Sequence, residues 1–161
     1  MPRFRLRLLP FLLATLCLTA GCASLSVGHL NRQPWTLDAD QSLEMNFWRF
    51  RYEILPVGDG FGVRGTALLR EDRIPPDMTR VEELWLSTYL SDESGEVLAK
   101  DLRVFLPRTL VPGQGVDFEF LLRPEEQASG RLYISFGYRT VLTGADKSTR
   151  PFFASEGAVS R

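Results

Sequence analysis

The sequence predicts an all-β domain folded as an antiparallel sandwich of about seven strands. Apolar and polar residues alternate with period two through most of the chain after Trp48. Turn-forming glycine, proline and aspartate residues recur at intervals of roughly 8–14 residues. No apolar pattern of helical period continues for three turns. A closed barrel is the alternative, because local patterning does not distinguish a barrel from a sandwich.

The first two predicted strands form a hairpin. Residues 48–54 place Trp48, Phe50, Tyr52 and Ile54 on one face and charged residues on the other. The glycines of Gly58-Asp59-Gly60 allow the positive φ angles of a tight turn. The second strand then continues with Phe61, Val63, Ala67 and Leu69. Two prolines, Pro75 and Pro76, interrupt the chain before the next apolar run.

Five further strands are predicted, over residues 83–90, 97–106, 116–122, 132–138 and 152–153. Their in-phase apolar residues are Leu84, Leu86 and Leu90; Leu102, Val104 and Leu106; Val116, Phe118, Phe120 and Leu122; and Leu132, Ile134, Phe136 and Tyr138. Phe152 and Phe153 are expected to form the last strand and to close the core. Turns are expected at residues 92–95 and 112–115. The candidate helical segments are short and cover residues 79–83 and 124–128.

Several of these positions match a known pattern. The matching residues are Val63-Arg64-Gly65, Tyr89-Leu90-Ser91-Asp92, Gly95-Glu96-Val97-Leu98, and Pro112-Gly113 before Phe118 and Phe120. They resemble the FxLYD-type, immunoglobulin-like domains of bacterial surface and periplasmic proteins. The chain has Arg70-Glu71-Asp72 where that family often has asparagine. The resemblance implies an immunoglobulin-like sandwich and implies no catalytic or ligand-binding residues.

Residues 1–21 have the layout of a secretory signal peptide. Three arginines, Arg3, Arg5 and Arg7, precede an uncharged, leucine-rich run from Leu8 to Leu18. This run is too short to span a bilayer, which takes roughly 20 apolar residues. Export from the cytoplasm is therefore expected.

The end of this segment resembles the lipobox of bacterial lipoproteins. Leu18, Thr19, Ala20 and Gly21 precede Cys22 and are the predicted signal-peptidase recognition residues, with Thr19 where the family usually has leucine. The resemblance implies cleavage before Cys22 and acyl chains on that cysteine, which would anchor the protein in the membrane. Ala23 replaces the aspartate of the inner-membrane retention signal, which favours the outer membrane. The alternative is an ordinary signal peptide in which Cys22 is incidental.

Cleavage before Cys22 would leave 140 of the 161 residues, with 16 basic and 20 acidic side chains. This mildly acidic balance gives no footprint for nucleic acid. Cys17 would leave with the signal peptide, so neither a disulfide nor a cysteine-based metal site is expected. Residues 22–41 are predicted to be a lipidated tether and residues 42–161 the sandwich. As an alternative, Trp35 and Leu37 could pack on the domain as an edge strand.

The sequence contains no recognisable catalytic arrangement. The single histidine, His29, lies in the predicted tether without a partner that could hold it as a general base. Glu82-Glu83 and Glu125-Glu126 are adjacent pairs, which a strand would point to opposite faces. We therefore predict a protein that is not an enzyme, with no cofactor, no metal and no catalytic residue.

A binding patch is predicted opposite the leucine face of residues 83–90. If Leu84, Leu86 and Leu90 are in the core, then Trp85 and Tyr89 lie outside, and Tyr133 and Arg139 have the corresponding phase. The alternative is that a neighbouring loop, such as residues 144–150, covers these side chains.

Two functions remain in competition. The first is a non-catalytic envelope lipoprotein that acts as an adapter or accessory subunit. Its partner would be an envelope protein, and the lipid on Cys22 would attach it to the membrane. It predicts an exposed apolar patch or an open strand edge. The alternative is a ligand- or inhibitor-binding lipoprotein that presents an aromatic-lined pocket to a glycan, a lipid or a small molecule.

Lipidation is directly testable by the substitution Cys22→Ser. Because the acyl chains hold the protein on the membrane, the variant should appear in the soluble periplasmic fraction and lose labelling by radioactive fatty acid. If the variant stays in the membrane fraction like the unaltered protein, the lipoprotein prediction is wrong.

Overall fold

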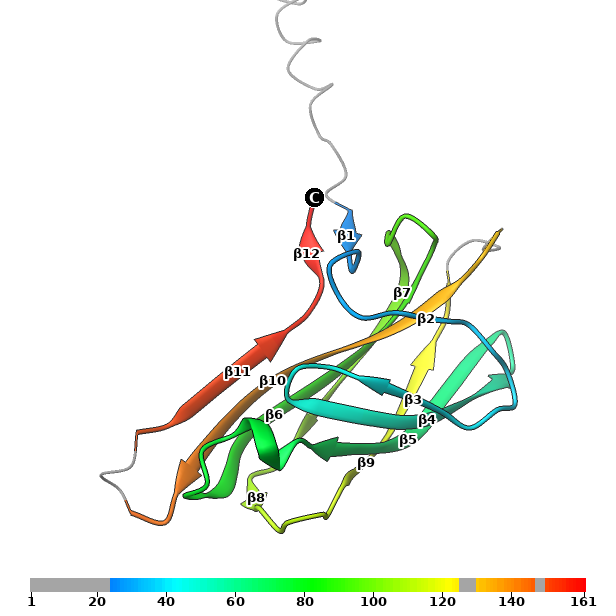
Figure 1. Cartoon of the computed structure of the whole chain (residues 1–161). Coiled ribbons are helices and arrows are strands. Elements are labelled where there is room, and N and C mark those ends of the chain that lie inside the picture. Colours follow the sequence, from blue (N-terminus) through cyan, green and yellow to red (C-terminus); the bar gives the residue numbers. More distant parts are fainter. Residues whose placement is uncertain (1–23, 125–129, 147–149) are drawn as a thin grey trace, which may run out of the picture.

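The computed structural model describes residues 24–124, 130–146 and 150–161, which form two facing antiparallel sheets (Figure 1). The four-stranded sheet has the order β3 (Gln41–Glu44), β4 (Trp48–Val57), β5 (Gly60–Leu69), β9 (Val116–Leu122). The six-stranded sheet has the order β11 (Phe152–Glu156), β10 (Tyr133–Gly144), β6 (Met78–Ser91), β7 (Val97–Phe105). Two short strands complete it, β2 (Gln33–Pro34) beside β10 and β8 (Arg108–Thr109) beside β6.

The predicted all-β sandwich is confirmed, and each of the seven expected strands is present. The strand order β4-β5-β9 facing β11-β10-β6-β7 corresponds to strands A-B-E and G-F-C-C′ of an immunoglobulin-like sandwich. The chain passes from the four-stranded sheet to the six-stranded sheet between β5 and β6, returns between β8 and β9, and crosses again between β9 and β10. Each sheet therefore contains strands that are distant in sequence, and the two sheets share one core.

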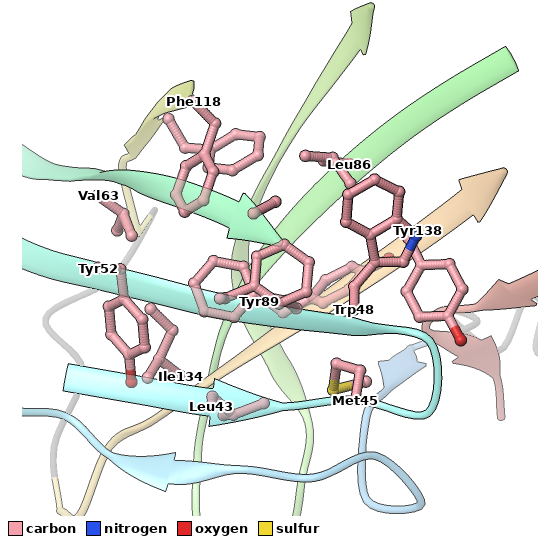
Figure 2. Packing of buried hydrophobic residues seen from close by; sticks show 14 of the residues in the cluster. Leu43, Met45, Trp48, Tyr52, Val63, Leu86, Tyr89, Phe118, Ile134 and Tyr138 are labelled. Atoms are coloured by element: carbon pink, nitrogen blue, oxygen red, sulfur yellow. The ribbon is translucent and has the colours of Figure 1, made fainter. Parts of the chain in front are cut away.

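The core is formed by the apolar faces that the alternation predicted. In β4, Trp48, Phe50, Tyr52 and Ile54 are buried, and the charged residues between them point outwards. The rings of Phe50 and Phe136 stack with their centroids 4.2 Å apart and join the two sheets. Figure 2 shows Trp48, Tyr52 and Phe118 among the side chains that fill the space between the sheets. This aromatic packing supplies the burial that a domain without disulfides requires.

The prediction of a helical segment at residues 79–83 is wrong, because these residues form the first part of β6. The extended conformation there is stabilised by pairing with β10 and with β8 on both sides. The helical turn described in this region is a short 3₁₀ segment at Glu71–Arg73, ahead of Pro75 and Pro76. Most of the other candidate helix, at residues 124–128, lies outside the described residues.

Residues 24–41 are built into the domain, in contrast to the predicted tether. Strand β1 (Leu25–Ser26) pairs with β12 (Val159–Ser160), and the Val27 backbone N–H donates to the Gly95 carbonyl at 2.9 Å. Val27 is 0% exposed and Leu30 is 8% exposed. The segment shows no regular apolar period because its backbone follows an irregular path. Its few apolar side chains nevertheless bury enough surface to hold it against the sandwich.

The alternative that Trp35 and Leu37 pack on the domain as an edge strand is confirmed in part, because Trp35 contacts the sheets, but the strand at this place is β2 (Gln33–Pro34) and contains neither residue. The Trp35 ring lies edge-on to Phe61 with the centroids 5.2 Å apart, and its backbone N–H donates to the Leu132 carbonyl at 2.8 Å. Leu37, the second residue of that alternative, remains largely exposed. The contact with the sheets is therefore made by Trp35.

The predicted signal peptide, the recognition residues Leu18 to Gly21 and the acylation site Cys22 lie outside the described residues. Among the residues that are described, no helix is long and apolar enough to cross a membrane.

The substitution Val27→Ala tests whether this N-terminal segment is part of the folded domain. Removing two fully buried methyl groups should lower the free energy of unfolding by about 2 kcal/mol. Urea unfolding of the soluble Cys22→Ser protein measures the effect. His29→Ala is the matched control, because His29 is exposed in the same segment and should change stability by less than about 0.5 kcal/mol. Equal midpoints for Val27→Ala and the parent protein would contradict the observed packing.

Candidate functional site

The outer face of the six-stranded sheet carries the predicted patch. Leu84, Leu86 and Leu90 are buried in the core, so Trp85 and Tyr89 point to the opposite face, as expected. The strand register places Trp85 between Arg139 of β10 and Val104 of β7. Residues from neighbouring strands are thereby brought into one row across the sheet.

Arg139 lies between two aromatic rings in this row. Its guanidinium carbon is 5.5 Å from the ring centroid of Trp85 and 5.5 Å from that of Phe153. Its Nε is 2.6 Å from an Oε1 of Glu83, which holds the guanidinium in place. Cation–π contacts at exposed sites contribute about 0.5–1 kcal/mol each. The two rings are therefore presented in a defined arrangement.

Apolar side chains extend this row to both edges of the sheet, with Phe153 on β11 and with Leu102 and Val104 on β7. Phe153 is 59% exposed, Trp85 38%, Val104 63% and Leu102 45%. We call Trp85, Leu102, Val104, Arg139 and Phe153 the aromatic face. Exposed apolar residues that gather on one face mark interaction surfaces, whereas scattered ones carry no such meaning.

Tyr89, a predicted member of the patch, is covered and only 8% exposed. The segment between β11 and β12 crosses over it, and the Tyr89 hydroxyl accepts a long hydrogen bond of 3.4 Å from the Ala158 N–H. The ring also lies over Gly137, where an added Cβ would approach the Glu156 carbonyl to 2.8 Å and the ring to 3.0 Å. Residues 157–158 cover Tyr89. The alternative that a neighbouring segment covers the predicted patch is therefore correct for Tyr89, but the covering segment is residues 157–158 and not the loop at residues 144–150.

Tyr133, the remaining predicted patch residue, lies away from the aromatic face. It pairs with Ser91, the last residue of β6, whereas Trp85 lies in the middle of that strand. The Arg32 guanidinium lies 5.1 Å from the centroid of its ring. The structure therefore joins Trp85 and Arg139, and it separates both from Tyr89 and Tyr133.

Two grooves flank the covering segment. One has a volume of about 490 Å³ and is lined by residues that include His29, Trp85, Arg139, Glu156 and Val159. The other, of about 420 Å³, lies on the side of Lys100 and Leu102. Phe153 and Val104, the most exposed members of the aromatic face, line neither groove.

The edges of the four-stranded sheet are capped by side chains. Asn31 and Gln33 donate to backbone carbonyls of β3, and Asp101 and Arg103 bond to backbone groups of β9. These bonds are Asn31 Nδ2 to Glu44 O (2.6 Å), Gln33 Nε2 to Ser42 O (2.7 Å), Leu121 N to Asp101 Oδ2 (2.9 Å) and Arg103 Nε to Glu119 O (3.1 Å). Capped backbone groups are not available to pair with another chain.

The two edges of the six-stranded sheet differ from one another. On β7, the Leu102 N–H donates to Asp101 Oδ1 at 2.7 Å, and the Leu102 carbonyl accepts from Arg103 Nη1 at 3.2 Å. On β11, no side chain of the described residues bonds to a backbone group. Within the described part of the chain, side chains bond to the backbone of β7 only at Leu102 and to that of β11 at no position, so β11 is the more open edge, and it carries Phe153 of the aromatic face.

The outer face of the four-stranded sheet is charged. It forms an open depression of about 900 Å³ lined by residues such as Arg51, Glu53, Arg64, Asp117 and Glu119. An ion pair joins Glu53 to Arg64 across β4 and β5, and Thr66 donates to Asp117 at 2.8 Å. Tyr52 and Phe118, which also border this depression, turn their side chains into the core. The outer face of the four-stranded sheet is therefore polar, whereas the outer face of the six-stranded sheet carries the aromatic face.

The strongest pKa shifts belong to buried tyrosines. Burial raises the pKa of Tyr52, and burial followed by the neighbouring Glu156 raises the pKa of Tyr138. Both phenols therefore stay protonated, and Tyr52 donates to Gln33 Oε1 at 2.8 Å. Among the described residues, no group of three or more His, Cys, Asp or Glu side chains is arranged to hold a metal ion.

Comparisons with protein-family models, with curated proteins and with solved structures gave no match to this chain.

Proposed function

We propose that this protein is a non-catalytic lipoprotein of the bacterial envelope, anchored through Cys22 in the outer membrane, whose sandwich binds a protein partner. The lipobox-like residues Leu18 to Cys22 support the anchor. The aromatic face supports the binding role and is the observation that carries the proposal. The partner is an envelope protein for which this domain acts as an adapter or accessory subunit.

The composition of the aromatic face favours a protein partner. Tryptophan, arginine and phenylalanine are enriched at protein interfaces, and tryptophan and arginine dominate their binding energy. The contacts of Arg139 with Trp85 and Phe153 already bring these three side chains together, so a partner would lose less entropy in ordering them. The open edge of β11 would let the partner add a strand beside Phe153, with backbone hydrogen bonds continuing the sheet.

A ligand-binding role is the second candidate, and the groove beside Trp85 favours it. Its volume of about 490 Å³ falls within the usual range for ligand sites, and Arg139 and Glu156 supply polar groups. A molecule in this groove would nevertheless leave Phe153 and Val104 exposed, because neither residue lines it. A partner lying across the sheet would cover the grooves and both of these residues.

Site-specific photo-crosslinking in intact cells tests the proposal. A benzophenone amino acid at position 104 or 153 should give the same discrete protein adduct from both positions, identified by mass spectrometry. Val57 is the matched control, because it is 48% exposed and belongs to the four-stranded sheet. It should give no such adduct.

A competing substitution sharpens the test. Phe153→Lys places a charge on the aromatic face and should reduce the adduct formed from position 104 by at least about tenfold, as expected for a loss of roughly 1.4 kcal/mol. If adducts are absent, or equally abundant from positions 57, 104 and 153, the proposed interface is wrong.

A further inference from the structure

The described chain begins next to the predicted lipid attachment site and is fixed to the domain from its first residue. The carbonyl of Ser24 accepts from the Arg161 N–H at 2.9 Å. Leu25 and Ser26 pair with β12, and Ser26 also bridges to Glu96 at the end of the β6–β7 turn. Two parts of the chain that are distant in sequence, the C-terminal residues 159–161 and the β6–β7 turn, therefore hold the segment that follows Cys22.

The β6–β7 turn packs closely against this segment. An added Cβ on Gly95 would come within 2.7 Å of the Gly28 backbone, so the turn and the N-terminal segment are in backbone contact. Arg32 Nη1 donates to the carbonyls of Asp92 and Glu93 at 3.1 and 3.3 Å. We call β1, β12 and the turn at residues 92–96 the β1–β12 end. Figure 1 shows β1 and β12 together at one end of the molecule, with β8 at the opposite end.

The covalent chain limits how far this end can lie from the lipid. Ser24 is two positions after Cys22, so the Cα atoms of these residues lie at most about 7 Å apart. A disordered tether of the predicted length would instead have a reach of roughly 25 Å. An acylated Cys22 lies at the level of the lipid headgroups, so Ser24 would lie within one headgroup layer of it.

We infer that the β1–β12 end rests directly on the lipid headgroups and that the domain is held in one orientation relative to the membrane. This inference rests on the proposed lipid anchor at Cys22. The β1–β12 end carries more acidic than basic side chains, with Asp92, Glu93 and Glu96 in its turn against Arg161 and the adjacent Arg32. Such a surface is not attracted to anionic lipid, so the short connection determines the distance.

Fluorescence quenching in vesicles tests the inference. The acylated mature chain would have no free thiol, because Cys17 is removed and Cys22 carries lipid. A dye can therefore be placed by Glu93→Cys at the β1–β12 end, or by Gln114→Cys in the exposed turn near β8. The acylated protein is reconstituted in phosphatidylethanolamine–phosphatidylglycerol vesicles that contain a headgroup-spin-labelled lipid. Quenching should be at least about fivefold stronger at position 93 than at position 114.

A lengthened chain provides the matched control. Twenty glycine and serine residues inserted between Ala23 and Ser24 should remove most of the difference between the two positions, since the domain could then turn freely. Equal quenching in the acylated, unlengthened protein would overturn the inference alone. A purified protein whose mass shows no acyl group would overturn the proposed anchor, and the inference with it.

Discussion

The hydrogen bond from the Val27 N–H to the Gly95 carbonyl, together with the full burial of the Val27 side chain, ties the start of the described chain into the sandwich. Other features depend on this attachment. It brings β1 beside β12, and it places Asn31 and Gln33 where they cap the edge of β3. It also brings Trp35 against Phe61. A segment that looks like a linker in the sequence therefore completes one end of the domain and protects one of its edges.

The same attachment bears on the proposed function. With an anchor only two residues from Ser24, the sheets would have a fixed direction relative to the membrane, and so would the aromatic face. Val159 of β12 and Trp85 line one groove, so this face starts at the β1–β12 end and continues along the sheet towards β11. A partner that covers Phe153 and Val104 would then approach along the membrane surface. Such a partner would be another envelope protein attached to, or embedded in, the same membrane.

Much of the fold could be predicted from the sequence, because alternation reports directly on which face of a strand is buried. Trp48, Phe50 and Ile54 illustrate this, and so does the placement of Trp85 opposite the leucines. For Leu102 and Val104, alternation alone does not predict which face is buried. They are in phase with one another as core residues would be, yet they face solvent, since a period of two does not say which side of a sheet is covered. Phe153 was expected to help close the core, whereas only Phe152 packs inwards, against Phe47. The burial of Val27 and the covering of Tyr89 depend on contacts between distant parts of the chain, which local pattern does not record.

The most direct test of this account is amide hydrogen exchange of the soluble Cys22→Ser protein, followed residue by residue by NMR. Because the Val27 N–H is bonded to Gly95 and the Arg161 N–H to Ser24, both amides should exchange at least about a hundredfold more slowly than in an unstructured peptide. The amide of Asp59, in the exposed turn between β4 and β5, provides the fast reference. If Val27 and Arg161 exchange at the rate of an unstructured peptide while the amides of β6 remain protected, the N-terminal segment is a free tether and the account is contradicted.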